Sequence, residues 1–87
     1  MGEETLFEFP CDFPIKIVGL ASDDFRQFVL GIVTKHVGEL APERVVSRPS
    51  RDGKYLSLTC TFSADSRAQV DALYSDLTSE ERILMVL

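Results

Sequence analysis

Between Tyr55 and Phe62 the chain alternates strictly between polar and apolar side chains. The apolar members are Leu56, Leu58, Cys60 and Phe62, and the polar members are Tyr55, Ser57, Thr59 and Thr61. This period of two predicts a strand, over residues 54–62, in a sheet that has one covered and one open face. The Pro-Ser-Arg-Asp-Gly segment just before it carries the residues of a hairpin turn. Another strand, over residues 43–48, should therefore pair with the strand over residues 54–62.

Two amphipathic helices are expected, one on each side of this hairpin. Ser22 is expected to cap the first helix, with Asp23 and Asp24 in its first turn, and Gly38 to end it. Its apolar stripe consists of Phe25, Phe28, Val29, Ile32, Val33, His36 and Val37. The second helix begins at Ser66, which is expected to form a capping box with Gln69. Its apolar stripe consists of Val70, Leu73, Tyr74 and Leu77.

Two further strands complete the pattern, a β-branched run over 13–20 and the apolar stretch over 82–87. The order strand, helix, strand, strand, helix, strand, with right-handed crossovers, predicts an α+β fold of the ferredoxin-like type. In this two-layer sandwich two helices cover one face of a four-stranded antiparallel sheet, and the first and third strands are central. We expect a single domain over residues 1–87, with residues 1–12 as an N-terminal arm.

The last strand is apolar on both faces, because Ile83 and Met85 alternate with Leu84 and Val86. Two helices cover only one face of the sheet, so the other face needs a second cover. Three covers are compatible with the sequence. They are the apolar residues of the arm (Leu6, Phe7 and Phe9), a second copy in a homodimer formed through the sheet, or a partner protein.

Charge and composition exclude several classes of function. The 87 residues carry a net charge of -5, which argues against broad affinity for nucleic acid or for an anionic membrane. No apolar run approaches the roughly 18 residues of a membrane span, and the acidic start is unlike a signal peptide. With only two cysteines, Cys11 and Cys60, we expect reduced thiols in a cytoplasmic protein.

The sequence offers no set of residues suited to catalysis, to a metal ion or to a cofactor. His36 is the only histidine and lies on the apolar stripe of the first helix, where a packing role is expected. There is no glycine-rich nucleotide loop. Base stacking on the sheet needs aromatic residues on both central strands, and the expected open face offers only Tyr55. We therefore expect no enzyme activity, no cofactor and no nucleic-acid partner.

Four of the nine basic residues fall within eleven positions: Arg44, Arg48, Arg51 and Lys54. Residues 44–54 sum to +3 (four basic less Asp52), whereas the rest of the chain sums to -8 (five basic and thirteen acidic). One interpretation is that these charges protect an edge strand from unwanted pairing. The other is that they dock an acidic partner protein, with the neighbouring Tyr55 in the same surface.

Three segments carry a family resemblance: "FEFPCDFPIKIVG", "SRPSRDGKYLSLT" and "DALYSDLTSEERILMVL". Together they resemble the YbeD-like family of small bacterial proteins over nearly the whole chain. The resemblance implies a ferredoxin-like fold close to the ACT regulatory domains, no enzyme activity, and a regulatory link to lipoate metabolism. The turn departs from the family pattern at Arg51-Asp52, where many relatives carry a small polar residue and Lys.

ACT-like domains hold a small effector beside the loop that follows the first strand. The resemblance therefore places a candidate effector site at Gly19, Leu20, Ser22, Asp23 and Asp24. The ammonium group of an amino acid could meet one of the two aspartates, although the same residues could serve only to cap the helix. The expected function is a non-enzymatic regulatory or adaptor protein that acts through protein contacts. The alternative is a sensor that binds an amino acid or another small metabolite at this loop.

Overall fold

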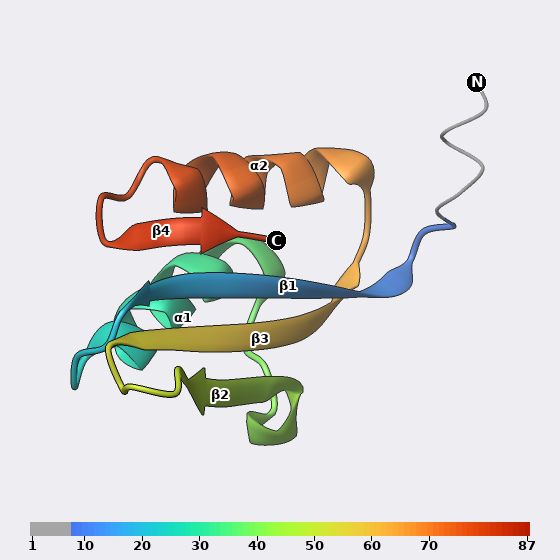
Figure 1. Cartoon of the computed structure of the whole chain (residues 1–87). Helices are drawn as coiled ribbons and strands as arrows, with labels where there is room; N and C mark the ends of the chain where they lie inside the picture. Colours follow the sequence, from blue (N-terminus) through green and yellow to red (C-terminus); the bar gives the residue numbers. More distant parts are fainter. Residues whose placement is uncertain (1–7) are drawn as a thin grey trace.

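The computed structural model describes residues 8–87 as a two-layer sandwich (Figure 1). Its elements are β1 (Cys11–Leu20), α1 (Phe25–Val37), the short 3-10 helix η2 (Pro42–Arg44), β2 (Val45–Pro49), β3 (Tyr55–Ala64), α2 (Arg67–Thr78) and β4 (Ile83–Val86). The strands form one antiparallel sheet in the order β2-β3-β1-β4, and both helices lie on the same side of it. The ferredoxin-like fold is confirmed, with the first and third strands in the centre.

The core lies between the sheet and the two helices. The alternation predicted for β3 is confirmed, because Leu58, Cys60 and Phe62 are buried while the residues between them are not. On the neighbouring central strand, Ile15 and Ile17 are fully buried opposite Cys60 and Leu58. The helices contribute Phe25, Val29, Ile32, Val33, Val70, Leu73 and Leu77. Each side chain of this size contributes about 1.5–3 kcal/mol when it is buried completely, so this layer dominates the stability of the domain.

The alternation predicted for β4 is wrong, because a β-bulge shifts its phase. Gly19 pairs with Ile83, whereas the preceding residue of β1 pairs with Met85, so Leu84 is an extra residue on β4. Ile83 is consequently buried and Val86 packs against the core, which puts these two residues on the helix side of the sheet. Leu84 and Met85 are both more than half exposed.

Helix α1 begins later than predicted. Its first residue is Phe25, so Ser22 and Asp23 precede the helix instead of opening it. Asp24 occupies the cap position but makes no side-chain hydrogen bond to the helix backbone. The predicted end is confirmed at Gly38, which has a φ of 83°.

The cap predicted for α2 is confirmed with one difference. The Ser66 hydroxyl accepts a hydrogen bond from the Gln69 amide at 3.1 Å. The Gln69 side chain, however, accepts from the amide of Asp65 at 2.7 Å and not from that of Ser66. Its amide nitrogen donates to the carbonyl of His36 at 3.0 Å, so the start of α2 is tied to the end of α1.

Strand β1 begins at Cys11, two residues before the predicted start at residue 13, so residues 11 and 12 belong to the sheet. Phe9 is partly buried and packs against the core. Leu6 and Phe7 lie outside the described residues. Within residues 8–87, the open face of the sheet leaves Leu20 and Met85 more than half exposed. No helix in this part of the chain is long and apolar enough to cross a membrane.

Candidate functional site

Gly19 of the predicted effector loop is required by packing. A Cβ atom at this position would lie 2.6 Å from the backbone carbonyl oxygen of Arg82 and would overlap the ring of Phe25. The Phe25 ring is fully buried, so it has no free space into which to move. The space beside Gly19 is therefore filled by the start of α1 and by the chain just before β4.

Asp24 is bound by a cation of the protein itself. Arg82 donates to both carboxylate oxygens of Asp24, at 2.7 Å and 3.2 Å, and also to the Ser22 hydroxyl at 2.9 Å. Ser22 in turn donates to Asp24 at 3.0 Å. The hydrogen bonds from Arg82 and then from Ser22 hold the pKa of Asp24 below its usual range. The guanidinium of Arg82 also lies over the ring of Phe28, 4.4 Å from its centroid.

This cluster fixes the loop after β1 to the chain just before β4. The ammonium group of an effector at Asp24 would have to displace Arg82, whereas the neighbouring Asp23 and Leu20 are exposed. Sequence reasoning did not single out Arg82, because the arginine and its aspartate are 58 positions apart. No local pattern connects them, and only the pairing of β4 with β1 brings them together.

The basic residues of 44–54 divide into two groups. Arg44 forms an ion pair with Asp12 at 3.3 Å across the sheet, so its charge is matched. Arg48 on β2 and Arg51 at the hairpin turn are exposed, and neither forms an ion pair with any residue of 8–87. Lys54 lies over the ring of the adjacent Tyr55, with its Nζ 5.5 Å from the centroid.

The hairpin that carries these charges is held by its own polar contacts. Asp52 accepts hydrogen bonds from the Lys54 amide at 3.0 Å and from the Ser50 hydroxyl at 2.8 Å. These two contacts, the amide first, lower the pKa of the Asp52 carboxyl. Ser50 also accepts from the amide of Tyr55 at 2.9 Å, and Gly53 adopts the positive φ of 74° that the turn needs. Asp52, the single acidic residue of 44–54, is thus engaged in hydrogen bonds within the turn.

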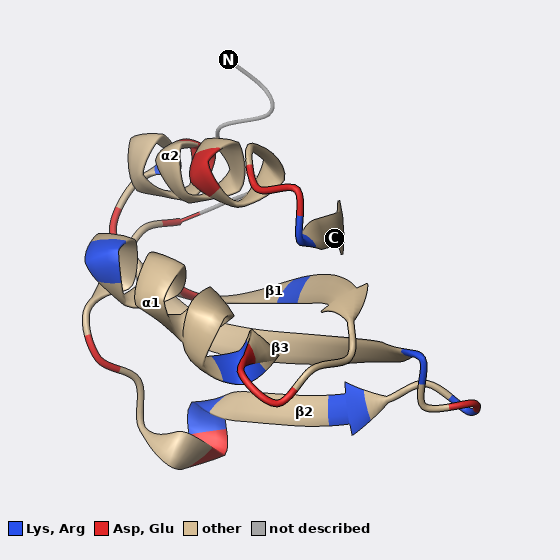
Figure 2. Ribbon diagram, turned by 90° about the vertical axis from the view of Figure 1, so that its left-hand side faces the viewer, with Lys and Arg blue, Asp and Glu red and all other residues tan. Residues whose placement is uncertain are grey.

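A shallow groove of about 350 Å³ lies on the open face of the sheet beside this hairpin. We call it the sheet-face groove; its lining includes Lys16, Val18, Arg48, Pro49, Tyr55 and Ser57. A second hollow of about 260 Å³ adjoins it and shares Lys16, Arg48 and Ser57. The sheet is hollow here because the short side chains of β3, Ser57 and Thr59, lie between the long ones of β1 and β2. Figure 2 shows the two basic segments, on β1 and β2, on either side of β3.

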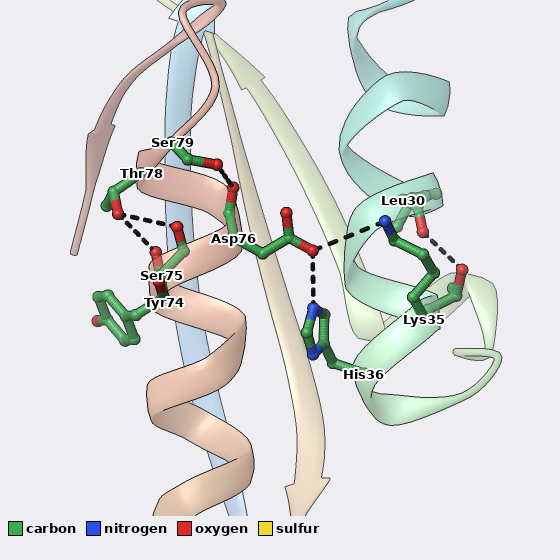
Figure 3. Close-up of polar contacts among 9 residues, drawn as sticks. Leu30, Lys35, His36, Tyr74, Ser75, Asp76, Thr78 and Ser79 are labelled. Atoms are coloured by element: carbon green, nitrogen blue, oxygen red, sulfur yellow. Dashed lines mark hydrogen bonds and ion pairs between the residues drawn. The ribbon is translucent and has the colours of Figure 1, made fainter.

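His36 and Asp76 join the two helices (Figure 3). His36 Nε2 lies 2.8 Å from a carboxylate oxygen of Asp76, and the Nζ of Lys35 lies 3.6 Å from the same oxygen. The hydrogen bond with His36 is the main cause that lowers the pKa of Asp76. His36 is half-buried between the helices, as a packing role requires. In the part of the chain that the structure covers, no three His, Cys, Asp or Glu side chains are grouped to hold a metal ion.

The two cysteines differ in burial. Cys60 is buried in the core, and burial raises the pKa of its thiol to about 11. Cys11 is half-buried at the start of β1, and both thiols are free. A thiol with such a high pKa carries almost no thiolate near neutral pH, so Cys60 serves packing.

The fold is that of an ACT-like ferredoxin domain, as two solved structures show. The solution structure of protein HP0495 from H. pylori matches with a TM-score of 0.71 and 9% identity, over 93% of this chain and 85% of that one. The ACT domain from the GTP pyrophosphokinase of Chlorobium tepidum matches with a TM-score of 0.66 and 15% identity, over 87% and 84% of the two chains. At these identities the likeness concerns the fold alone.

The chain belongs to the family described as "Protein of unknown function (DUF493)", whose match spans residues 4–87. It is 47% identical to the UPF0250 protein NE1487 of Nitrosomonas europaea over the whole of both chains. It is 44% identical to a UPF0250 protein of Paraburkholderia phytofirmans, over 97% of this chain and 94% of that one. The resemblance to a family of small bacterial proteins, inferred from the sequence, is thereby confirmed.

Proposed function

We propose that this protein is a non-enzymatic regulatory or adaptor domain that docks an acidic partner protein. The docking surface, which we call the basic hairpin surface, consists of Arg48, Arg51, Lys54 and Tyr55. One observation carries the proposal. Arg48 and Arg51 are exposed and have no carboxylate partner within residues 8–87, although the chain as a whole has a net charge of -5. An ACT-like fold is compatible with such a regulatory role.

Charge asymmetry is the physical basis of this docking. The hairpin is stiffened by Asp52 and Ser50, so the backbone that carries its cations loses little freedom on binding. A basic surface on an acidic body orients an acidic partner during approach and repels a basic one. Arg44 contributes little to this surface because Asp12 neutralises it. Edge protection of β2 remains the competing explanation, and it requires no partner.

A homodimer is part of the same proposal. Leu20, Met85 and Leu87 are 53%, 51% and 59% exposed. They lie along β1 and β4, which β3 separates from the basic residues of β2. A second copy that packs there would remove this apolar surface from water. Light scattering should then give the mass of two chains for the wild type and of one chain for Met85→Glu.

Reversing the charge of the docking surface tests the proposal. The variant Arg48→Glu/Arg51→Glu should lose partner capture, because both free cations become repulsive. The matched control is Lys35→Glu/Arg67→Glu, which makes the same charge change on the helical layer at side chains that are 65% and 64% exposed. The tagged proteins are cross-linked in the host cell, and the captured proteins are quantified by mass spectrometry. Equal capture by the three proteins would leave edge protection as the role of these charges.

The sensor hypothesis receives less support from the geometry. Asp24 is already paired with Arg82 and Ser22, and the ring of Phe25 fills the space beside Gly19. Of the predicted site, Leu20 and Asp23 are exposed and have no such contact in the described residues. A thermal-shift screen against the free amino acids tests this alternative, because a ligand that binds only the folded state must raise its stability. The link to lipoate metabolism stays a prediction of the family resemblance.

A further inference from the structure

We propose that the sheet-face groove is a binding site for a small organic anion with an apolar body. Lys16 and Arg48 supply two positive charges, and Val18 and Tyr55 supply the apolar wall. The Ser57 hydroxyl lies between the two cations and donates to the backbone carbonyl of Arg48 at 3.2 Å. This site is separate from the loop after β1. It lies on the opposite face of the sheet from the core, where no sequence pattern pointed to a ligand.

The register of the sheet places the two cations on opposite sides of the groove. Lys16 of β1 stands opposite Thr59 of β3, and Arg48 of β2 stands opposite Ser57 of the same strand. The spacing of strands and residues in a sheet puts the two Cα atoms about 12 Å apart. Both side chains are long and β3 carries only short hydroxyl residues between them. One anionic group above β3 is therefore within reach of both cations.

The cations of the groove have no carboxylate partner in the part of the chain that the structure describes. Neither Lys16 nor Arg48 forms an ion pair within residues 8–87. The nearest acidic residue along β1 on this face is Asp12, and Arg44 binds it. Asp52 of the hairpin accepts hydrogen bonds from the turn. Two unmatched cations that share one groove attract an anion more strongly than either does alone, and an arginine binds carboxylate and phosphate groups with two parallel hydrogen bonds.

The shape of the groove limits the size of the ligand. A volume of about 350 Å³ is at the lower end of small-molecule sites, and the groove is shallow. Val18 is half-buried beside Ser57, and the ring of Tyr55 is half-buried at the rim. A flat or short apolar body attached to the anionic group would rest on these two side chains while its charged end lies between Lys16 and Arg48.

Arg48 belongs both to this groove and to the basic hairpin surface. An anion held by Arg48 would therefore weaken docking of an acidic partner, which gives the small molecule control over the protein contact. This control rests on the proposed function, whereas binding of the anion does not. Lys16 is specific to the groove and Arg51 is specific to the docking surface, so the two properties can be removed separately.

Titration of the ¹⁵N-labelled protein with model compounds, followed by NMR at constant ionic strength, tests the site. The probes are benzoate, phenyl phosphate and the neutral benzamide. We expect saturable shifts of the amides of Lys16, Val18, Tyr55 and Ser57 with one or both anions and none with benzamide. Shifts with benzoate alone indicate a carboxylate ligand, with phenyl phosphate alone a phosphate ligand, and with both a site that accepts either group.

Single neutral variants complete the test. Lys16→Gln should weaken anion binding at least tenfold, while the matched Lys35→Gln and the docking variant Arg51→Gln should leave it unchanged. The spectrum of each variant reports directly whether it is folded. The proposal is overturned if benzamide shifts the same amides as benzoate, if the shifts do not saturate, or if Lys16→Gln binds as well as the wild type. Because this titration needs no partner protein, its failure is distinct from failure of the proposed docking.

Discussion

Replacing Gly19 with alanine should destabilise the protein by about 2–3 kcal/mol, the upper part of the range for an overpacked core. The new methyl group would overlap the Phe25 ring and lie 2.6 Å from the backbone oxygen of Arg82. Neither neighbour can yield easily, since the ring is fully buried and the oxygen belongs to the chain that leads into β4. The effect is purely steric, because the φ angle of Gly19 is not positive.

Gly31 provides the matched control, because alanine there is expected to change the stability in the opposite direction. It lies inside α1, and a Cβ atom there would meet nothing within 4 Å. Alanine at this position should stabilise the protein by about 0.5–1 kcal/mol, because it removes only the conformational freedom of a glycine in a helix. The same substitution is therefore expected to raise stability at one glycine and lower it at the other.

Urea unfolding followed by circular dichroism measures both changes under two-state conditions. In a thermal melt, about 2 kcal/mol corresponds to a loss of about 8–16 °C for a domain of this size. A second variant tests whether the Phe25 ring causes the loss of stability in Gly19→Ala. Phe25→Leu removes the ring edge, so Gly19→Ala should cost less in that background than in the wild type, and the two changes should not add. A Gly19→Ala protein with wild-type stability would refute the packing argument for this glycine.

Three further outcomes are expected. The lowered pKa of Asp76 means that its interaction stabilises the fold above its ordinary pKa of 3.8, and that this contribution is lost as the pH falls through the lower folded-state value. The urea midpoint of the wild type should therefore drop more between pH 6 and pH 3 than that of Asp76→Asn, and equal drops would argue against the helix-joining role. In a Cys11→Ser background, the Cys60 thiol should react with a disulfide reagent at pH 8 only after unfolding; rapid labelling of the native protein would contradict its burial. Arg82→Ala and Asp24→Asn should each speed hydrogen exchange of the loop amides to the same extent, with no further gain in the double variant, whereas additive effects would mean that the two residues act independently.

Local patterns were sufficient to predict the fold. Leu58, Cys60 and Phe62 alternate because β3 is buried on one face only, and this period is visible without any knowledge of the neighbouring strands. Ser66 and Gln69 are three residues apart, so their contact is also local. Both signals depend on short stretches of chain, and both are confirmed.

The features that were missed depend on contacts between distant segments. The bulge at Leu84 is defined by how β4 pairs with β1, and it reverses the face of Val86. Arg82 fixes the loop after β1 through its contact with Asp24, which lies 58 positions earlier in the sequence. Lys16 becomes part of a groove only because the register of three strands sets it across β3 from Arg48. No residue spacing within a single segment encodes any of these three relations.

The central claim is that Arg48 and Arg51 form a docking surface for an acidic partner. Its most direct test is quantitative in-cell capture with the wild type, Arg48→Glu/Arg51→Glu and Lys35→Glu/Arg67→Glu as parallel baits. The account predicts that at least one acidic protein is captured equally by the wild type and by the helical-layer control, and at least tenfold less by the hairpin variant. An identical set of captured proteins for all three baits, each shown to be folded, would contradict it.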